Sequence, residues 1–174
     1  EPARNIFREL GDRSSECMVL GNLSFLHTEL GDFESGEREA KASLAILRET
    51  GGLQFRSAAE VSLSNICLRS GRDAEARKYI DMAVATVREL GEPLLVAPMI
   101  YGVLKIRSGD RATGLAWIGF TRAHEKEFQK EIARDIARMW DELRGGLSDE
   151  EATAAMSRGE ALKHNNDPTW SIGS

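Results

Sequence analysis

The sequence predicts an all-α protein in which helical hairpins stack into an α–α superhelix. Two series of glycines predict this fold, one with a constant spacing of 40 residues and one that alternates with it along the chain. The first series is Gly11, Gly51 and Gly91, and the second is Gly31, Gly71 and Gly109. Ala, Leu, Glu and Arg dominate the chain and favour helices, whereas only 6% of the residues are aromatic, and we expect no strands. Helix-length segments between turns that recur with this period are typical of a stacked array.

Length and charge limit the class of protein. The 174 residues are enough for one repeat domain, and a net charge of −5 gives no general attraction for nucleic acid or for an anionic membrane. No apolar segment approaches the roughly 20 residues that span a bilayer, and no basic segment followed by an apolar one opens the chain. We therefore expect a cytoplasmic protein. Cys17 and Cys67 lie in apolar helical patterns without a cysteine or histidine at ligand spacing, so we expect free, buried thiols and no zinc site.

The chain opens with half of a hairpin. Residues 1–10 resemble the last turns of a second helix, which ends at Gly11 because glycine tolerates the left-handed conformation that follows many helices. Since Glu1 is not a methionine and falls inside this helix, we expect a piece of a longer protein whose N-terminal face is an exposed cut edge.

Three hairpins follow, at residues 12–50, 52–90 and 92–128. The first hairpin has helices at 15–30 and 33–48, and its first helix carries apolar residues at three- and four-residue spacing. The second has helices at 53–70 and 74–90. In the third, the segment 93–108 contains Pro98, which lacks a backbone donor, so its helix starts near Ala97 or is kinked.

Two capping helices and a tail complete the predicted domain of residues 1–164. The first capping helix, 131–144, has one apolar face. Ser148 and Glu151 have the spacing of a capping box, which predicts a second helix at 149–163. Residues 165–174 follow as a mobile tail because an Asn-Asn-Asp-Pro sequence interrupts the helix.

Small residues recur where the two helices of each hairpin are expected to touch. On the first helices these are Ser24, Ser64 and Gly102, and on the second helices they are Gly36, Ala76 and Gly114. With this register the chain resembles the tetratricopeptide (TPR) family in its 40-residue form. The aromatic residues typical of the family are replaced, on the first helices by His27, Cys67 and Lys105 and on the second by Ala40, Ile80 and Ile118. The segment 147–162 is similar to the end of many bacterial multidomain regulators, so the chain resembles the C-terminal TPR arm of such regulators and signalling ATPases.

The sequence contains no constellation that indicates catalysis. Neither glycine-rich phosphate-binding motif is present, and His27, His124 and His164 are far apart. We expect no enzyme, no metal and no cofactor.

The resemblance implies a concave groove lined by the first helix of each hairpin. Its lining would be Met18, Phe25, Thr28, Val61, Asn65, Leu68, Arg69, Val96, Met99, Val103, Ile106 and Arg107. This set is more apolar than a solvated face, and an apolar groove can bind an amphipathic helix or an extended peptide of a protein partner. Arg69 and Arg107 stand just before inner turns, where they either complement a helix C-terminus or hold a partner's carboxylates.

The predicted function is a non-catalytic protein–protein interaction module, part of a larger bacterial transcriptional or signalling regulator. Three alternatives remain open at this point. The groove residues could be core, or be covered by the chain's own C-terminal segment. The module could sense a small molecule. It could also be a structural module that forms a homodimer, with the groove filled by a second copy.

Overall fold

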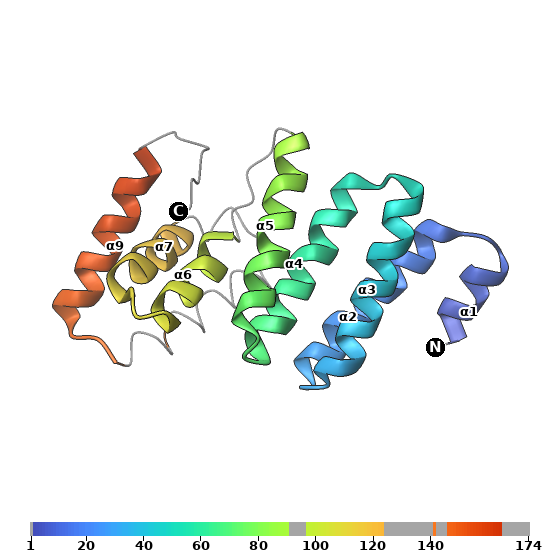
Figure 1. Cartoon of the computed structure of the whole chain (residues 1–174), viewed down its shortest axis with the longest axis horizontal. Helices are drawn as coiled ribbons and strands as arrows, with labels where there is room; N and C mark the ends of the chain where they lie inside the picture. The colour runs from blue at the N-terminus through green and yellow to red at the C-terminus, as the bar shows by residue number, and fades with distance from the viewer. Residues whose placement is uncertain (1, 91–96, 124–140, 142–145, 165–174) are drawn as a thin grey trace. The chain divides into compact units, whose positions relative to one another are not determined.

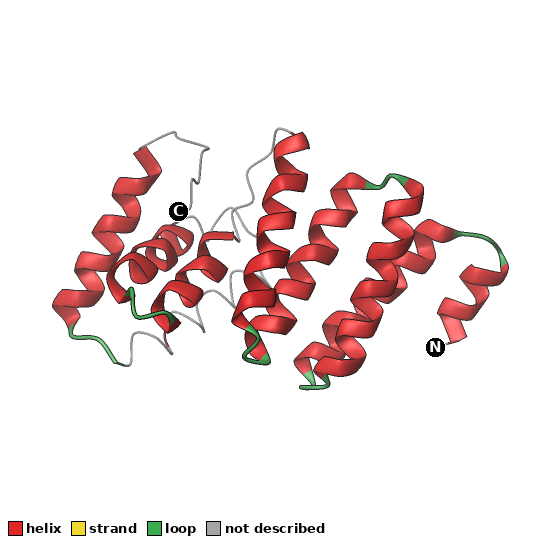
Figure 2. Cartoon of the chain, viewed as in Figure 1, coloured by secondary structure: helices red, strands yellow, loops and turns green. Residues whose placement is uncertain are grey.

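A computed structural model describes residues 2–90, 97–123, 141 and 146–164. Every regular element in these ranges is an α-helix, which confirms the predicted all-α class (Figures 1 and 2). The helices are α1 (Pro2–Glu9), α2 (Arg13–Glu29), α3 (Phe33–Thr50), α4 (Leu53–Arg69), α5 (Asp73–Leu90), α6 (Ala97–Arg107), α7 (Arg111–Ala123) and α9 (Asp149–His164). Each begins and ends within a few residues of a predicted helix.

The contacts divide the chain into two compact units, an N-terminal unit of Glu1–Leu94 and a C-terminal unit of Leu95–Ser174. The predicted single domain of residues 1–164, and the superhelix that would run through it, stay predictions. The predicted helix at 131–144, the tail at 165–174 and the end of the predicted hairpin at 92–128 lie outside the described residues.

The predicted turns are confirmed wherever the structure describes them. The glycines that end or separate helices have positive φ angles of 71° to 96°, a region that other residues rarely adopt. They are Gly11, Gly31, Gly51, Gly71 and Gly109. The spacing of glycines in the sequence therefore marks real chain reversals.

The inner turns of the three hairpins share one hydrogen-bond pattern. The amide of the residue after the glycine donates to the carbonyl five residues earlier, at distances of 2.8 to 2.9 Å. The pairs are Asp32 with His27, Arg72 with Cys67, and Asp110 with Lys105. The same backbone geometry thus recurs from one hairpin to the next.

Side chains cap the N-termini of several helices, including the one with the predicted capping box. Asp12, Asp32 and Asp110 each accept a hydrogen bond from the amide three residues later, at 3.1 to 3.3 Å. Ser148 and Glu151 form the reciprocal bonds of a capping box before α9.

α6 starts at Ala97, which places Pro98 in the first turn, where its missing amide donor costs nothing. The choice between the two predicted alternatives, a helix that starts near Ala97 and a kinked helix, depends on residues 93–96, which lie outside the described residues.

The small residues lie at the helix crossings, as predicted. A Cβ atom added at Gly114 would be 2.5 Å from the carbonyl oxygen of Gly102, so α6 and α7 meet backbone to backbone. A Cβ atom added at Gly36 would be 2.7 Å from the Thr28 hydroxyl of α2. In the second hairpin the Ser64 hydroxyl donates to the Ala76 carbonyl at 2.7 Å. Small side chains are thus what lets each pair of helices approach this closely.

Each unit has an apolar core of its own. In the N-terminal unit the core cluster combines residues of α2, α3 and α4, namely Cys17, Leu20, Ala40, Leu44, Ile46, Leu47, Ala59, Leu63 and Ile66. In the C-terminal unit α7 packs against both α6 and α9, with Ile100, Ile118 and Ala155 fully buried. Tyr101 and Trp117 meet edge to face there, with ring centroids 5.5 Å apart.

Candidate interaction surface

α2 exposes two large apolar side chains on one of its sides. Met18 is 62% exposed and Phe25 is 52% exposed. They are seven residues apart, which is close to two helical turns, so they lie on the same side of α2. Gly21 and Asn22, between them, are also exposed. We call Met18, Gly21, Asn22 and Phe25 the α2 stripe.

The other predicted groove residues of the N-terminal unit are less accessible. Val61 and Asn65 of α4 are half-buried, whereas Leu68 is buried. Thr28 is also buried, and its hydroxyl donates to the Ser24 carbonyl at 2.7 Å within the crossing of α2 and α3. Of the predicted groove residues in this unit, Met18 and Phe25 therefore offer the most apolar surface to a partner.

Arg69 already holds a carboxylate of its own chain. Its Nη1 lies 2.7 Å from Oε1 of Glu29, and its guanidinium lies over the Phe33 ring, 5.4 Å from the centroid. Both contacts reach from the second hairpin back to the first. In this conformation Arg69 connects consecutive hairpins, and a partner's carboxylate would have to compete with Glu29.

The predicted groove residues of the C-terminal unit differ in exposure. Met99 and Val103 are buried, Ile106 is half-buried and Arg107 is exposed. Val96 lies outside the described residues. The candidate surface is therefore defined here within the N-terminal unit alone.

A second ionic contact between the hairpins starts from the inner turn of the second hairpin. Arg72, just before α5, places Nη2 2.5 Å from Oε2 of Glu37 in α3, and Lys41 approaches the other oxygen of Glu37 to 2.6 Å. The hydrogen bond from Arg72 is the main reason that the pKa of Glu37 is lowered. The same pair raises the pKa of Arg72, so both groups stay charged at neutral pH.

α4 and α5 share a buried polar network. The Thr86 hydroxyl donates to Oε2 of Glu60 at 2.8 Å and accepts from Nη2 of Arg56 at 2.8 Å. Nε of Arg56 lies 3.4 Å from the other oxygen of Glu60. Since Glu60 and Thr86 are almost completely buried, each needs these partners.

His27 has a partner that the sequence analysis did not predict. Its Nδ1 lies 2.8 Å from Oε2 of Glu39, across the crossing of α2 and α3. Twelve residues separate this pair, as they separate Ser64 from Ala76. This common spacing across an inner turn is the signal that could have identified the pair.

The described residues contain little that indicates chemistry. Cys17 and Cys67 are free and buried, as predicted, and burial raises the pKa of both thiols. Among those residues no group of three His, Cys, Asp or Glu side chains could hold a metal ion. None of the described helices is both long and apolar enough to cross a bilayer.

Comparison of the chain with protein-family models, with curated proteins and with solved structures finds no match. Any functional proposal therefore rests on the sequence pattern and on the contacts and exposures of the residues.

Proposed function

We propose that this chain is a non-catalytic protein-interaction module of the tetratricopeptide type. More particularly, we propose that it is the partner-binding arm of a larger bacterial transcriptional or signalling regulator. The observation that carries the proposal is the exposure of Met18 and Phe25 on one side of α2. The resemblance in the sequence supplies the family, and the repeated turn geometry supports it.

The α2 stripe has the chemistry of a peptide-binding surface. Burying a Phe or Met side chain against a partner is worth about 1.5 to 3 kcal/mol. Methionine adapts its shape to different partners, and the glycine at position 21 allows a second backbone to come close. Asn22 can hydrogen-bond a peptide backbone between the two apolar contacts. The proposed ligand is a peptide with two apolar side chains, one for Met18 and one for Phe25. Its backbone between these side chains would form hydrogen bonds with Asn22.

The scaffold around the stripe is held by polar contacts. Glu29 and Arg69 join α2 to α4, and His27 and Glu39 join α2 to α3. A surface on a helix fixed in this way loses little conformational freedom when it binds. This favours recognition by a preformed surface.

The test is a selection of peptides from a random display library against the whole chain, followed by affinity measurements on variants. Phe25→Asp is expected to weaken the binding of the selected peptides by at least about tenfold. Leu26→Asp is the matched control, because Leu26 is the next residue, is similarly exposed at 54%, and points about 100° away around the helix. The Leu26→Asp variant should bind the selected peptides with an affinity within about twofold of that of the unaltered chain.

Two outcomes would contradict the proposal. Peptides that bind equally well to both variants would place binding elsewhere. A chain that sediments as a dimer and becomes monomeric in Phe25→Asp would show that the stripe joins two copies instead. Thermal unfolding of both variants should change little, since both side chains are more than half exposed.

A further inference from the structure

The end of the α2 stripe next to Phe25 carries an ion pair. Glu29 follows Phe25 by four residues, about one helical turn, so it lies on the same side of α2. Nη1 of Arg69 in α4 donates to Oε1 of Glu29 at 2.7 Å. The side chains of Glu29 and Arg69 are 33% and 31% exposed, so a peptide that lies along the stripe reaches both charges.

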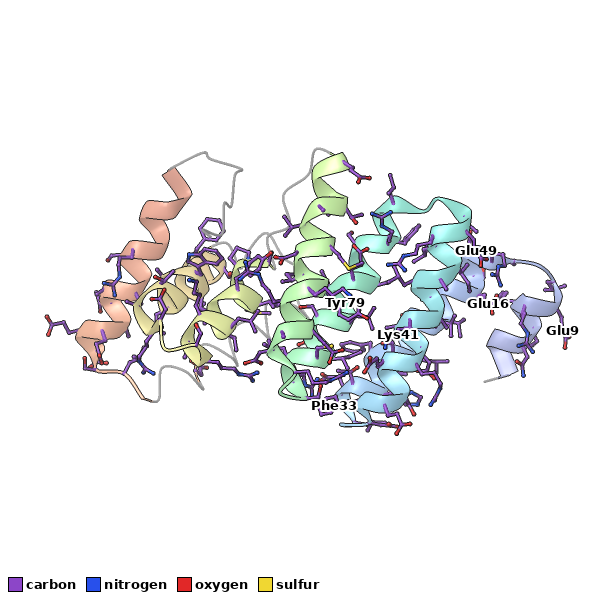
Figure 3. The ribbon with its side chains drawn as sticks, viewed as in Figure 1. Glu9, Glu16, Phe33, Lys41, Glu49 and Tyr79 are labelled. Carbon is purple, nitrogen blue, oxygen red and sulfur yellow. The ribbon has the colours of Figure 1, made fainter. Side chains whose placement is uncertain are left out.

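Phe33 fixes Arg69 from another direction. It is the first residue of α3, and its ring is half-buried against the core cluster of the N-terminal unit (Figure 3). The guanidinium of Arg69 lies over this ring, 5.4 Å from the centroid. Since this contact does not involve Glu29, Arg69 should keep its place when the charge of Glu29 is removed.

Between Met18 and Phe25 the surface presents no charge. The six residues of α2 that separate them are all uncharged. α4 contacts α2, and in the twelve residues of α4 before Arg69 the single charged residue is Glu60, which is only 1% exposed. A peptide that extends from Met18 past Phe25 therefore first meets charge at the ion pair.

Glu29 and Arg69 offset each other toward a charged peptide side chain. A carboxylate that approached Arg69 would also approach Glu29, and an ammonium group that approached Glu29 would also approach Arg69. Because the two charges are in contact, the attraction from one is largely offset by the repulsion from the other. The peptide side chain would still lose part of its hydration, which costs a charged group more than an uncharged one. An uncharged side chain is therefore favoured beside the pair.

We propose that the Glu29–Arg69 pair makes this site specific for peptides that are uncharged next to the apolar side chain that contacts Phe25. The inference rests on the proposed function and adds the class of peptide that the stripe selects. Phe25 and Glu29 are about 6 Å apart along the helix axis, a distance that an extended peptide covers in about two residues. Each member of the pair repels the charge that the other would attract, which is how an interface excludes unwanted partners.

The test uses a peptide selected on the whole chain from the random display library. The peptide is synthesised with Gln, Glu or Lys at each position within two residues of its apolar side chains, and fluorescence anisotropy at low salt measures the binding. At the position beside the pair, the unaltered chain should bind the Gln form most tightly. Glu29→Gln should improve the binding of the Glu form at this position about two- to fivefold relative to the Gln form, because Arg69 then has no competing carboxylate. Arg69→Gln should improve the binding of the Lys form at the same position by a similar factor.

Asp81→Asn is the matched control. Asp81 forms an ion pair with Arg77 on α5, with 3.1 Å between Nε and Oδ1, and the substitution changes the net charge as Glu29→Gln does. It should leave the ranking of the three peptide forms unchanged. Circular dichroism should show an unchanged fold for Glu29→Gln, because Glu29 is an exposed residue.

Two results would overturn the inference while the peptide-binding function stands. One is a peptide that depends on Phe25 but binds the unaltered chain most tightly in its Glu or Lys form at the position that Glu29→Gln affects. The other is a ranking of the three forms that neither Glu29→Gln nor Arg69→Gln changes at any position. If no peptide is selected, or if the selected peptides bind Phe25→Asp equally well, the proposed function fails and the inference fails with it.

Discussion

Individual glycines of this chain differ in what surrounds them. A Cβ atom at Gly114 would meet the Gly102 carbonyl at 2.5 Å and the Ile106 side chain at 2.6 Å, whereas one at Gly21 would have nothing within 4 Å. Backbone cannot move aside as a flexible side chain can. The same substitution should therefore have opposite effects at the two positions.

Gly114→Ala is expected to destabilise the C-terminal unit by about 1 to 3 kcal/mol, because the added methyl group forces α6 and α7 apart. Gly21→Ala, the matched control within a helix, should stabilise the protein by about 0.5 to 1 kcal/mol. Chemical denaturation followed by circular dichroism measures both. Equal effects of the two changes would show that the crossing is looser than the structure describes.

The hydroxyl of Thr86 is the centre of the buried network with Arg56 and Glu60. Thr86→Val keeps the volume but removes this hydroxyl, so it leaves a buried carboxylate oxygen without its donor. We expect a loss of about 1 to 3 kcal/mol in the free energy of unfolding. Thr86→Ser retains the hydroxyl and should lose less. A larger loss for Thr86→Ser would mean that the methyl group, and not the network, stabilises this site.

At the level of helices, the polar contacts between hairpins depend on pH. Folding lowers the pKa of Glu37, so its ionised carboxylate stabilises the fold. That contribution is complete above the ordinary pKa of 4.5 and is lost as the pH falls through the lower folded value. Glu37→Gln removes the charge at every pH.

The stability difference between the unaltered chain and Glu37→Gln should accordingly be on the order of 1 kcal/mol at neutral pH. It should shrink as the pH is lowered below 4.5. Urea denaturation over a pH series measures the difference. Glu34→Gln, at an exposed position of the same helix, controls for the change in net charge. A difference that grows on acidification would contradict the assigned ion pair.

The helices and turns could be predicted from the sequence because their signals are local. Glycine, aspartate and a capping box act within a few residues, and the regular recurrence of the turn glycines identified the hairpins. The ion pair of Arg72 with Glu37 could not be predicted in this way, since 35 residues separate the partners and the pairing depends on how two hairpins pack.

The candidate surface was predicted less completely than the fold. Met18 and Phe25 are exposed as a binding surface requires, but the same mapping placed Thr28 and Leu68 beside them, and both are buried. Helical periodicity gives the side of a helix a residue occupies, whereas burial also depends on the helices that pack against that side. The exposure of Leu26 could not be predicted for the same reason, because Leu26 follows the apolar pattern of a core residue.

At the level of the whole chain, the division at residues 94 and 95 bears on how the protein folds. A continuous stack of repeats couples each repeat to its neighbours, so removing one part would weaken the next. The N-terminal unit, however, contains its own core cluster from α2, α3 and α4. Its ionic contacts through Arg69 and Arg72, and the network at Thr86, also join residues inside the unit.

We therefore expect residues 1–94 alone to fold into the same helices. The isolated segment should show a helical circular dichroism spectrum and a cooperative thermal transition, since it keeps the apolar core and the contacts that fix its hairpins. Thr86→Val introduced into this segment should lower the transition temperature, because the network it disrupts lies wholly within residues 56–86. A segment that is unfolded, or that unfolds without cooperativity, would show that the two units depend on each other and would favour the predicted continuous domain of residues 1–164.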